Sequence, residues 1–278
     1  MKLKKRRNII TTTGIIIFSV AVISLFMWKH DAEDEANHTP EYARINLEEL
    51  LELDILTEEH YKLLFMQTGL GKPAVDYLWI NDRRKILDVQ EYFFHKPEIM
   101  CEMNSIISWQ ESIKSNERYT CHIVGIEDGD ILISPCSHVF GWRNGHAALV
   151  VDADNGKVLE SVVLGEDSVV SSIEHWKDFP SFIVLRVRGI TEEEREMIVD
   201  YALNNLNGLR YGFIGDIFQN DVEKGEVFST HCAHLVWRAY MEGGYNLDSD
   251  GGIVVTPKDI AESPLLEIVQ VYGMELDD

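Results

Sequence analysis

Between Arg118 and Ile190 the chain contains five short segments that are rich in β-branched residues and are separated by Gly, Asn and Asp. The segments are RYTCHIVGI, GDILISPCSHVF, GHAALVVDAD, GKVLESVVL and SFIVLRVRGI. Segments of this kind are typical of β-strands joined by tight turns. A sheet built from them has to bury one face at least, so it needs helices or a second sheet to cover it.

Two helices are predicted after these strands. The segment TEEEREMIVDYALNNLNG has Thr191 as its N-cap, three acidic residues in its first turn and Gly208 at its end. The segment STHCAHLVWRAYMEGG begins a second helix near Ser229 and closes it at Gly244. Residues 119–278 are therefore predicted to form an α+β fold, an antiparallel sheet with helices packed on it.

Residues 45–118 are predicted to form a helical subdomain. Asn46, followed three positions later by Glu49, has the pattern of a capping box. Thr57 begins a second helix, which stops at Gly69 in the segment GLG. The apolar spacing in AVDYLWI and KILDVQEYFF indicates that further helices follow.

The N-terminal 29 residues differ from the rest. MKLKKRR precedes NIITTTGIIIFSVAVISLFMW, a run of 21 residues without a charge. As a helix with a rise of about 1.5 Å per residue it would be about 32 Å long, close to the hydrocarbon thickness of a bilayer. We expect residues 1–29 to be a transmembrane anchor with a cytoplasmic N-terminus and 30–44 a polar linker outside the membrane. Cleavage as a signal peptide, which would give a secreted protein, is the alternative.

The charge of the chain argues against one class of partner. The formal net charge is −22, and residues 1–29 contain six of the 25 basic residues and no acidic residue. The remainder has 19 basic and 47 acidic residues, a net charge of −28. Such a surface repels phosphate backbones, so we expect no nucleic-acid partner.

The four cysteines are dispersed and form no CxxC pair. This spacing is unlike that of disulfide-rich secreted scaffolds, so we expect a fold that does not depend on bridges. One bridge, Cys101 to Cys121 or Cys121 to Cys136, stays open.

Cys232 is the candidate nucleophile. Thr230 or Ser229 is the expected N-cap, which places Cys232 in the first turn of a helix. Free backbone N–H groups and the positive end of the helix dipole stabilise a thiolate there. Cys232 also lies on an apolar face with Leu235 and Val236, so an ordinary buried thiol is the alternative.

His146 is the candidate base, because it begins a predicted strand directly after Gly145, at the rim of the sheet. Glu160, on the next strand, is the candidate for orienting the imidazole. A two-residue turn would pair Glu160 with Val151, on the opposite face from His146. A three-residue loop would pair it with Val150, on the same face, so the pairing of Glu160 with His146 requires the longer loop or a bulge.

Two metal sites compete with this hypothesis. His231, Cys232 and His234 are neighbours in sequence, and Cys136 and His138 are further candidate zinc ligands. Adjacent helical positions point in different directions, so we expect His231 and His234 to be bystanders and no metal or other cofactor to be used. The segment LDSDGG lacks the glycine that a calcium loop requires at its sixth position.

Three blocks resemble the NlpC/P60 superfamily of papain-like hydrolases. They are GDILIS, GWRNGHAALVVDADNGKVLESV and THCAHLVWRAYMEGGYNLDSDGGIVVTPKDIAESPLL. The order, with histidine before cysteine, resembles the circularly permuted branch of YiiX/YebB-like and YycO-like proteins, relatives of the lecithin retinol acyltransferase group. The likeness covers about residues 119–278, and GLGKPAVDYL also resembles YycO-type proteins.

The resemblance implies a circularly permuted papain-like fold and a thiol protease or amidase. It implies Cys232 as nucleophile, His146 as general base and Glu160 as the orienting residue, with Tyr211 as a substrate-pocket residue. Asp130 would be a structural turn residue. The family usually has Ser after the cysteine and then an acidic or polar residue; this chain has Ala and His, which affects local hydrogen bonding.

The expected function is that of a membrane-anchored, extracytoplasmic cysteine peptidase or amidase that acts on amide bonds, with peptidoglycan stem peptides of the cell wall as candidate substrates. The first alternative is a lipid or acyl-amide hydrolase or acyltransferase of the lecithin retinol acyltransferase type. The second is a membrane-tethered binding protein that has lost its activity.

Overall fold

The computed structural model describes most of the chain beyond residue 35. The described residues are 36–105, 108–114, 121–139, 141–162, 165–212 and 229–275, with 15–16, 18–20 and 23 near the N-terminus.

The predicted N-terminal transmembrane helix requires correction. Among the described residues, no helix is both long and apolar enough to cross a membrane. A crossing needs about 20 continuous helical residues, and the described helical pieces in this part of the chain are 15–16, 18–20 and 23. Most of the predicted span lies outside the described residues.

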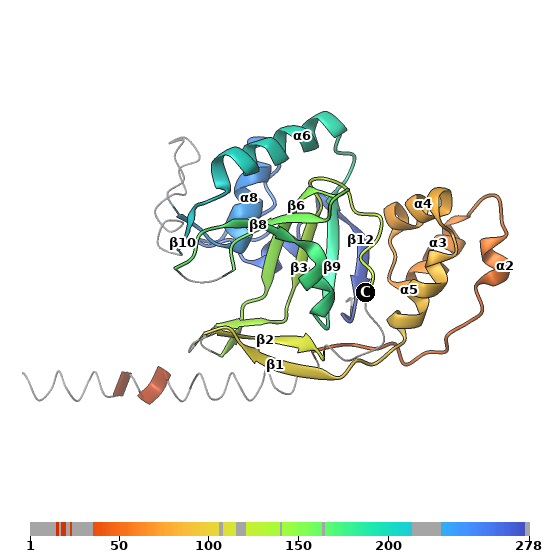
Figure 1. The fold of residues 1–278 in the computed structure, drawn as a ribbon, viewed down its shortest axis with the longest axis horizontal. Coiled ribbons are helices and arrows are strands. Elements are labelled where there is room, and N and C mark those ends of the chain that lie inside the picture. Colours follow the sequence, from red (N-terminus) through yellow and green to blue (C-terminus); the bar gives the residue numbers. More distant parts are fainter. Residues whose placement is uncertain are drawn as a thin grey trace, which may run out of the picture.

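A six-stranded antiparallel sheet is the centre of the molecule (Figure 1). In spatial order its strands are β12 (Leu266–Tyr272), β9 (Phe182–Val187), β3 (Ile131–Ser134), β6 (His146–Asp152), β7 (Lys157–Glu160) and β8 (Val169–Ser172). The α+β class with an antiparallel sheet agrees with the sequence prediction, although β8 and β12 were not predicted. No strand forms within the described residues of RYTCHIVGI, 121–126.

The two faces of this sheet bury two different cores. Alternate residues such as Ile131, Ala147 and Leu149 belong to one core, and their neighbours such as Leu132 and Ala148 belong to the other. This is the period-two alternation of a sheet covered on both sides. The site therefore stands on strands whose side chains are fixed by packing above and below.

Helices near the C-terminal half cover one face, where α6 and α8 lie together in Figure 1. They are α6 (Glu192–Tyr201), continued by a π-helical segment η2 (Ala202–Leu206), α8 (Cys232–Glu242) and the short α9 (Pro257–Ala261). The predicted N-cap Thr191 is confirmed. Its side chain accepts from the Glu194 N–H, and the Glu194 carboxylate accepts from the Thr191 N–H.

The helical subdomain lies beside edge strand β12. Its helices are α2 (Glu48–Leu51), α3 (Glu58–Thr68), α4 (Lys72–Asn81) and α5 (Lys85–Phe93). Thr57 caps α3 as predicted, and the helix ends at Gly69, whose φ is 69°. Asn46 is not the N-cap of α2, because the N-cap is Leu47, although the Asn46 side chain accepts from the Glu48 N–H.

Backbone pairing attaches this subdomain to the sheet. The Val271 N–H donates to the Gly69 carbonyl and the Gly71 N–H donates to the Val269 carbonyl, at 2.8 and 2.9 Å. A Cβ at Gly69 or Gly71 would lie 2.0 or 1.8 Å from a carbonyl oxygen of β12. The GLG segment thus needs both glycines because two backbones approach each other closely.

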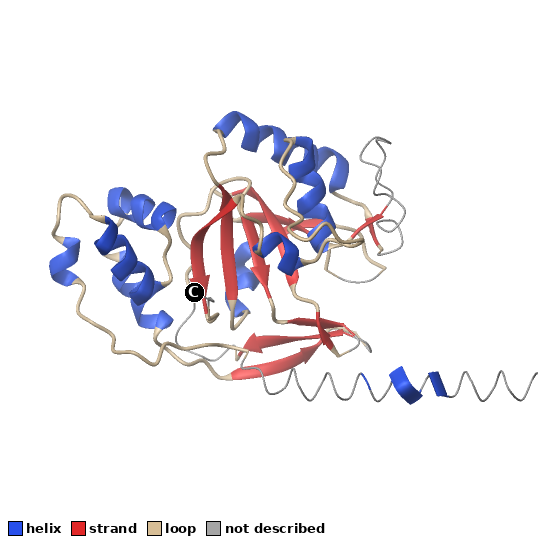
Figure 2. Cartoon of the chain, turned by 180° about the vertical axis from the view of Figure 1, so that it is seen from behind, coloured by secondary structure: helices blue, strands red, loops and turns tan. Residues whose placement is uncertain are grey.

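The helical pattern predicted up to residue 118 ends at Phe93. A hairpin follows, β1 (Ile99–Met103) and β2 (Ser108–Ile113), and it forms a second antiparallel sheet with β4 (Ser137–Val139) and β5 (Trp142–Arg143). Figure 2 shows these strands apart from the main sheet. The hairpin was not predicted from the sequence because IMCEM and SWQESI contain few β-branched residues.

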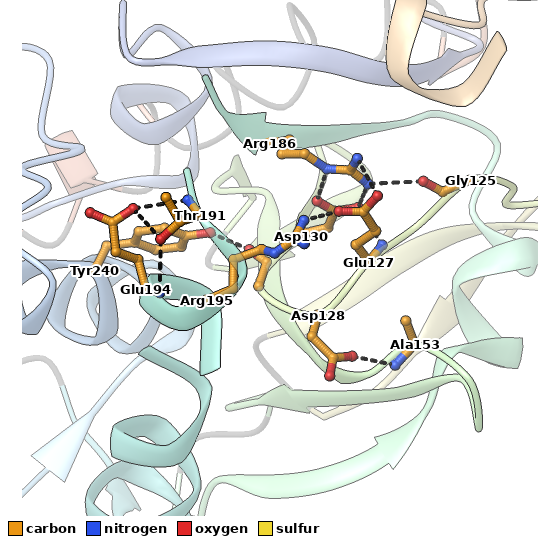
Figure 3. Close-up of polar contacts among 11 residues, drawn as sticks. Gly125, Glu127, Asp128, Asp130, Ala153, Arg186, Thr191, Glu194, Arg195 and Tyr240 are labelled. Carbon is orange, nitrogen blue, oxygen red and sulfur yellow. Dashed lines mark hydrogen bonds and ion pairs between the residues drawn. The ribbon is translucent and has the colours of Figure 1, made fainter. Parts of the chain in front are cut away.

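An ion-pair network supports the loop before β3 (Figure 3). Arg186 of β9 donates from Nε and Nη2 to the two carboxylate oxygens of Asp130, each at 2.7 Å. Its Nη1 is 3.0 Å from Glu127, which also pairs with Arg195. Asp130 is fully buried and accepts the Glu127 N–H at 2.8 Å, as expected of a structural turn residue.

Candidate active site

Cys232 is the first residue of α8 and is buried. The short strand β11 (Ser229–Thr230), paired in parallel with β10 (Arg210–Tyr211), leads into the helix. The N-cap is His231, whose ring accepts from the His234 N–H, rather than the predicted Thr230 or Ser229. Cys232 therefore lies in the first helical turn, where the backbone N–H groups and the helix dipole stabilise negative charge.

His146 and Glu160 are brought together by the pairing of β6 with β7. Glu160 pairs with Ala148, and a bulge between Val150 and Asp152 shifts the register. Neither of the two short loops considered from sequence is formed, but the bulge places Glu160 on the same face as His146. Glu160 Oε2 is 2.8 Å from His146 Nε2, which leaves Nδ1 as the ring nitrogen available to Cys232.

The second oxygen of Glu160 contacts two side chains that sequence analysis did not single out. His175 Nε2 is 3.2 Å from Glu160 Oε1, and the Ser171 hydroxyl donates to the same oxygen. His175 belongs to η1 (Ile173–Asp178), a 3₁₀ helix. The next residue, Trp176, stacks on the His146 ring with centroids 5.2 Å apart and planes 19° apart. The Glu160 carboxylate thus contacts His146, Ser171 and His175. The His146 ring contacts Glu160 and Trp176.

The charges of these groups depend on one another. Burial raises the pKa of the Cys232 thiol, but hydrogen bonds and charge from His146 and His231 outweigh burial and lower this pKa to about 5. Burial lowers the pKa of His146, whereas Cys232 and Glu160 raise it to about 10. Burial raises the pKa of Glu160, while His146 and His175 pull it well below its ordinary value. These shifts favour a thiolate beside an imidazolium, and thiolate is the reactive form of cysteine.

His231 takes part in this arrangement, contrary to the expectation that it is a bystander. Its interaction with Cys232 helps to lower the pKa of the thiol, and its ring also caps α8. His234 behaves differently, since its Nδ1 is 3.1 Å from the Thr230 hydroxyl. Ser229 and Thr230 are preferred N-cap residue types that precede it directly, so the role of His231 could not be singled out from the sequence.

A cleft of about 360 Å³ opens beside Cys232. Cys232, His146 and Tyr211 all line it, and so do His175 and His231. Glu160 is 2 % exposed and is not among the lining residues. A larger cavity of about 880 Å³ is lined by none of these residues.

The structure separates Cys136 from the other candidate zinc ligands, whereas His138 lines the same cleft as Cys232 and His231. Cys136 packs in the core on the other face of the sheet from Cys232, with its sulfur 3.1 Å from the Ser181 hydroxyl. In the described part of the chain, the one group of three or more close ligand side chains is Asp248, Asp250 and Asp259, whose oxygens lie within 4.8 Å of one another.

These three carboxylates have structural partners. Asp248 accepts the Gly251 N–H, Asp250 accepts the Gly252 N–H, and Asp259 caps α9 through Thr256. The four cysteines are free, so neither of the two bridges left open from sequence forms.

The fold and the site together define an α+β protein with a buried cysteine, histidine and glutamate at one cleft. No protein-family model matches the chain. It is similar to uncharacterized protein YycO of Bacillus subtilis (strain 168), with 27% identity over 128 residues, which are 46% of this chain and 49% of the relative. The chain therefore spans about half the length of the curated relative that it matches.

A solved structure described as metalloprotein YiiX from Escherichia coli O157:H7, DUF1105, covers 51% of this chain and 96% of its own, with 16% identity and a TM-score of 0.41. The YycO match supports a relationship to the YycO-like proteins that the motifs indicated. Membership of the wider NlpC/P60 superfamily stays a prediction.

Proposed function

We propose that this chain is a cysteine hydrolase that cleaves an amide bond through an acyl-enzyme on Cys232. The observation that carries the proposal is the 2.8 Å contact between His146 and Glu160 at a cleft that Cys232 also lines. A nucleophile at a helix N-terminus, a histidine within its reach and a carboxylate behind the histidine are the components of acyl-transfer catalysis.

In the first half of the reaction the Cys232 thiolate attacks the substrate carbonyl carbon. In this proposal the Cys232 backbone N–H, at the start of α8, donates to the oxyanion. The His146 imidazolium then gives its proton to the leaving amine as the carbon–nitrogen bond breaks, and an acyl-enzyme and a free amine remain.

In the second half, His146, now neutral, takes a proton from water as the water oxygen attacks the thioester. The carbon–sulfur bond breaks, the acid product leaves and the thiolate and imidazolium are restored. Glu160 keeps its charge throughout and stabilises the imidazolium. Tyr211, which lines the cleft, is the proposed substrate contact.

Two substrate classes, peptides and lipid amides or esters, fit the proposed reaction. Peptidoglycan stem peptides were expected because of the predicted anchor, and that support is lost with the transmembrane helix. Lipid amides and esters fit the lecithin retinol acyltransferase alternative. We place peptides first because the resemblance is to papain-like hydrolases, and no described residue discriminates between the two classes.

The proposed function predicts that Cys232→Ala abolishes cleavage. The full chain is incubated with purified stem peptides and, separately, with an N-acyl amide, and the released amine is measured. We expect release from one class and a decrease of at least about 10³-fold in Cys232→Ala, because the acyl acceptor atom is gone. Cys101→Ala, an exposed cysteine on β1, is the matched control and should keep full activity.

Cleavage that survives Cys232→Ala would contradict the proposal. If neither class is cleaved and Cys232 does not react with iodoacetamide faster than Cys101, the chain is better described as a binding protein that has lost its activity.

A further inference from the structure

Three residues that line the cleft, here called its polar wall, carry buried polar atoms that lack hydrogen-bond partners among the described residues. They are both ring nitrogens of His138, Nε of Arg143 and the hydroxyl oxygen of Ser161. All three residues line the cleft beside Cys232. Native proteins pair nearly all their buried polar atoms, so several unpaired atoms in one cleft indicate a surface that a ligand completes.

The wall is fixed in place by its own contacts. Glu111 of β2 accepts from Nη1 and Nη2 of Arg143, each at 3.2 Å. The Nε–H of the same guanidinium has no hydrogen-bond partner among the described residues. The same carboxylate is 3.3 Å from His138 Nε2, a close contact without hydrogen-bond geometry. Trp109 stacks on His138 with centroids 3.6 Å apart and planes 7° apart. The second sheet thus presents an ordered polar surface to the cleft.

The lining of the cleft differs from the rest of the chain in its charged residues, although Glu111 pairs with Arg143. Among the described residues, no Asp or Glu lines it, whereas Arg143 and Lys258 do, together with four histidines. The chain as a whole has 47 acidic residues. The larger cavity, by contrast, is lined by seven acidic residues, Glu127, Asp128, Asp152, Asp154, Glu174, Glu192 and Glu196. The absence of carboxylates from the 360 Å³ cleft therefore suits a ligand that carries negative charge.

We propose that this wall binds an anionic group of the substrate, a carboxylate or a phosphate, next to the Cys232 thiol. Arg143 Nε–H and the Ser161 hydroxyl are the donors that such a group would accept from, and Lys258 adds positive charge at the rim. The inference rests on the proposed function, because it names the substrate class of that same cleft.

Two alkylating reagents of similar size test the site without knowledge of the substrate. Iodoacetate is anionic and iodoacetamide is neutral, and both transfer a carbon to the thiolate with loss of iodide. The rate constant for each reagent at Cys232 is measured at pH 7 and low salt by mass spectrometry, and the ratio of the two is the readout. Dividing one by the other removes any change in the nucleophilicity of the thiolate itself.

Three variants should lower the ratio of the iodoacetate to the iodoacetamide rate. Ser161→Ala and Lys258→Gln are expected to lower it about threefold and Arg143→Gln up to about tenfold, because each removes a donor or a charge near the carboxylate of the reagent. Ser263→Ala is the matched control for Ser161→Ala, since Ser263 also has a buried hydroxyl without a partner among the described residues but does not line the cleft. Lys157→Gln, at an exposed position of β7, is the control for Lys258→Gln.

The outcomes separate this inference from the proposed function. A ratio that is unchanged in both Ser161→Ala and Lys258→Gln overturns the anion site and leaves the nucleophile intact. A Cys232 that reacts with neither reagent faster than Cys101 overturns the proposed function, and the anion site with it.

Protection experiments identify the source of the anion. Glutarate that slows alkylation of Cys232 by iodoacetamide indicates a carboxylate, and glycerol 3-phosphate that does so indicates a phosphate such as that of a lipid headgroup. Lack of protection by either at tens of millimolar contradicts the site.

Discussion

Replacing His146 by alanine is expected to lower the rate at which iodoacetamide alkylates Cys232 at pH 6 by about a hundredfold or more. Of the groups that lower the pKa of the Cys232 thiol against the effect of burial, His146 has the largest effect. Without it, a thiol with an ordinary pKa near 8.5 would be only about 0.3% ionised at pH 6, and burial would reduce this fraction further.

The measurement is the second-order rate constant at Cys232, read by mass spectrometry with Cys101 as an internal reference. His60→Ala is the matched control, because His60 lies on α3 and bonds only within the cap of that helix. Thermal unfolding of each variant checks that the fold is kept. An alkylation rate in His146→Ala equal to that of the unsubstituted protein would show that the imidazole does not activate the thiol.

Replacing Arg186 by methionine is expected to lower the free energy of unfolding by about 3–5 kcal/mol. The Asp130 carboxylate is fully buried, and both its oxygens accept from Arg186 at 2.7 Å. Burial raises the pKa of Asp130 to about 6 even though Arg186 lowers it. The carboxylate therefore depends on the guanidinium, and removal of one partner leaves a buried charge without compensation.

Urea or guanidinium unfolding measures this effect, and the double variant Asp130→Asn/Arg186→Met completes the cycle. The double variant should lose less than the sum of the two single variants, because it removes the uncompensated charge. Lys72→Met, which breaks the exposed pair with Asp76, should cost less than about 1 kcal/mol. A similar small loss in Arg186→Met would contradict the role given to the pair.

Local signals in the sequence located much of the main sheet. The alternating segments around Ile131, His146 and Phe182 correspond to β3, β6 and β9, because period-two patterns are a direct consequence of a sheet with two buried faces. The N-caps Thr57 and Thr191 could also be predicted, since a capping box spans only four consecutive residues.

Long-range pairing determined what could not be predicted. Strand β12 depends on β9, about 80 residues earlier in the chain, and the hairpin of β1 and β2 depends on β4. Nothing local in IMCEM or SWQESI distinguishes a strand from the helical pattern that precedes it. The predicted transmembrane helix failed in another way: it was inferred from apolar length alone, and no described helix has that length.

The proximity of His146 and Glu160 could be predicted as far as the strand register could be inferred. His146 and Glu160 lie on neighbouring strands, so whether they share a face of the sheet depended on the length of one loop and on a bulge. His175 and His231 could not be reached in this way. His175 contacts Glu160 only because η1 follows β8, a strand that sequence analysis missed.

The central claim is that Cys232 and His146 form a thiolate and imidazolium pair held by Glu160. The most direct measurement is the rate of iodoacetamide alkylation at Cys232 against pH, with Cys101 followed in the same samples. The pKa of the Cys232 thiol is lowered to about 5 and that of His146 is raised to about 10. Burial and the nearby Glu111 charge, in contrast, raise the pKa of Cys101.

The lowered pKa of Cys232 means that its reactive form is present above that pKa and is lost as the pH falls through it. We therefore predict a rate at Cys232 that is nearly constant from about pH 6 to 9 and falls near pH 5, while the rate at Cys101 rises throughout this range. In Glu160→Gln the fall at Cys232 should move to higher pH, since His146 loses the charge that holds its proton. A rate at Cys232 that follows that of Cys101 with pH, and is unaffected by Glu160→Gln, would contradict the catalytic assignment.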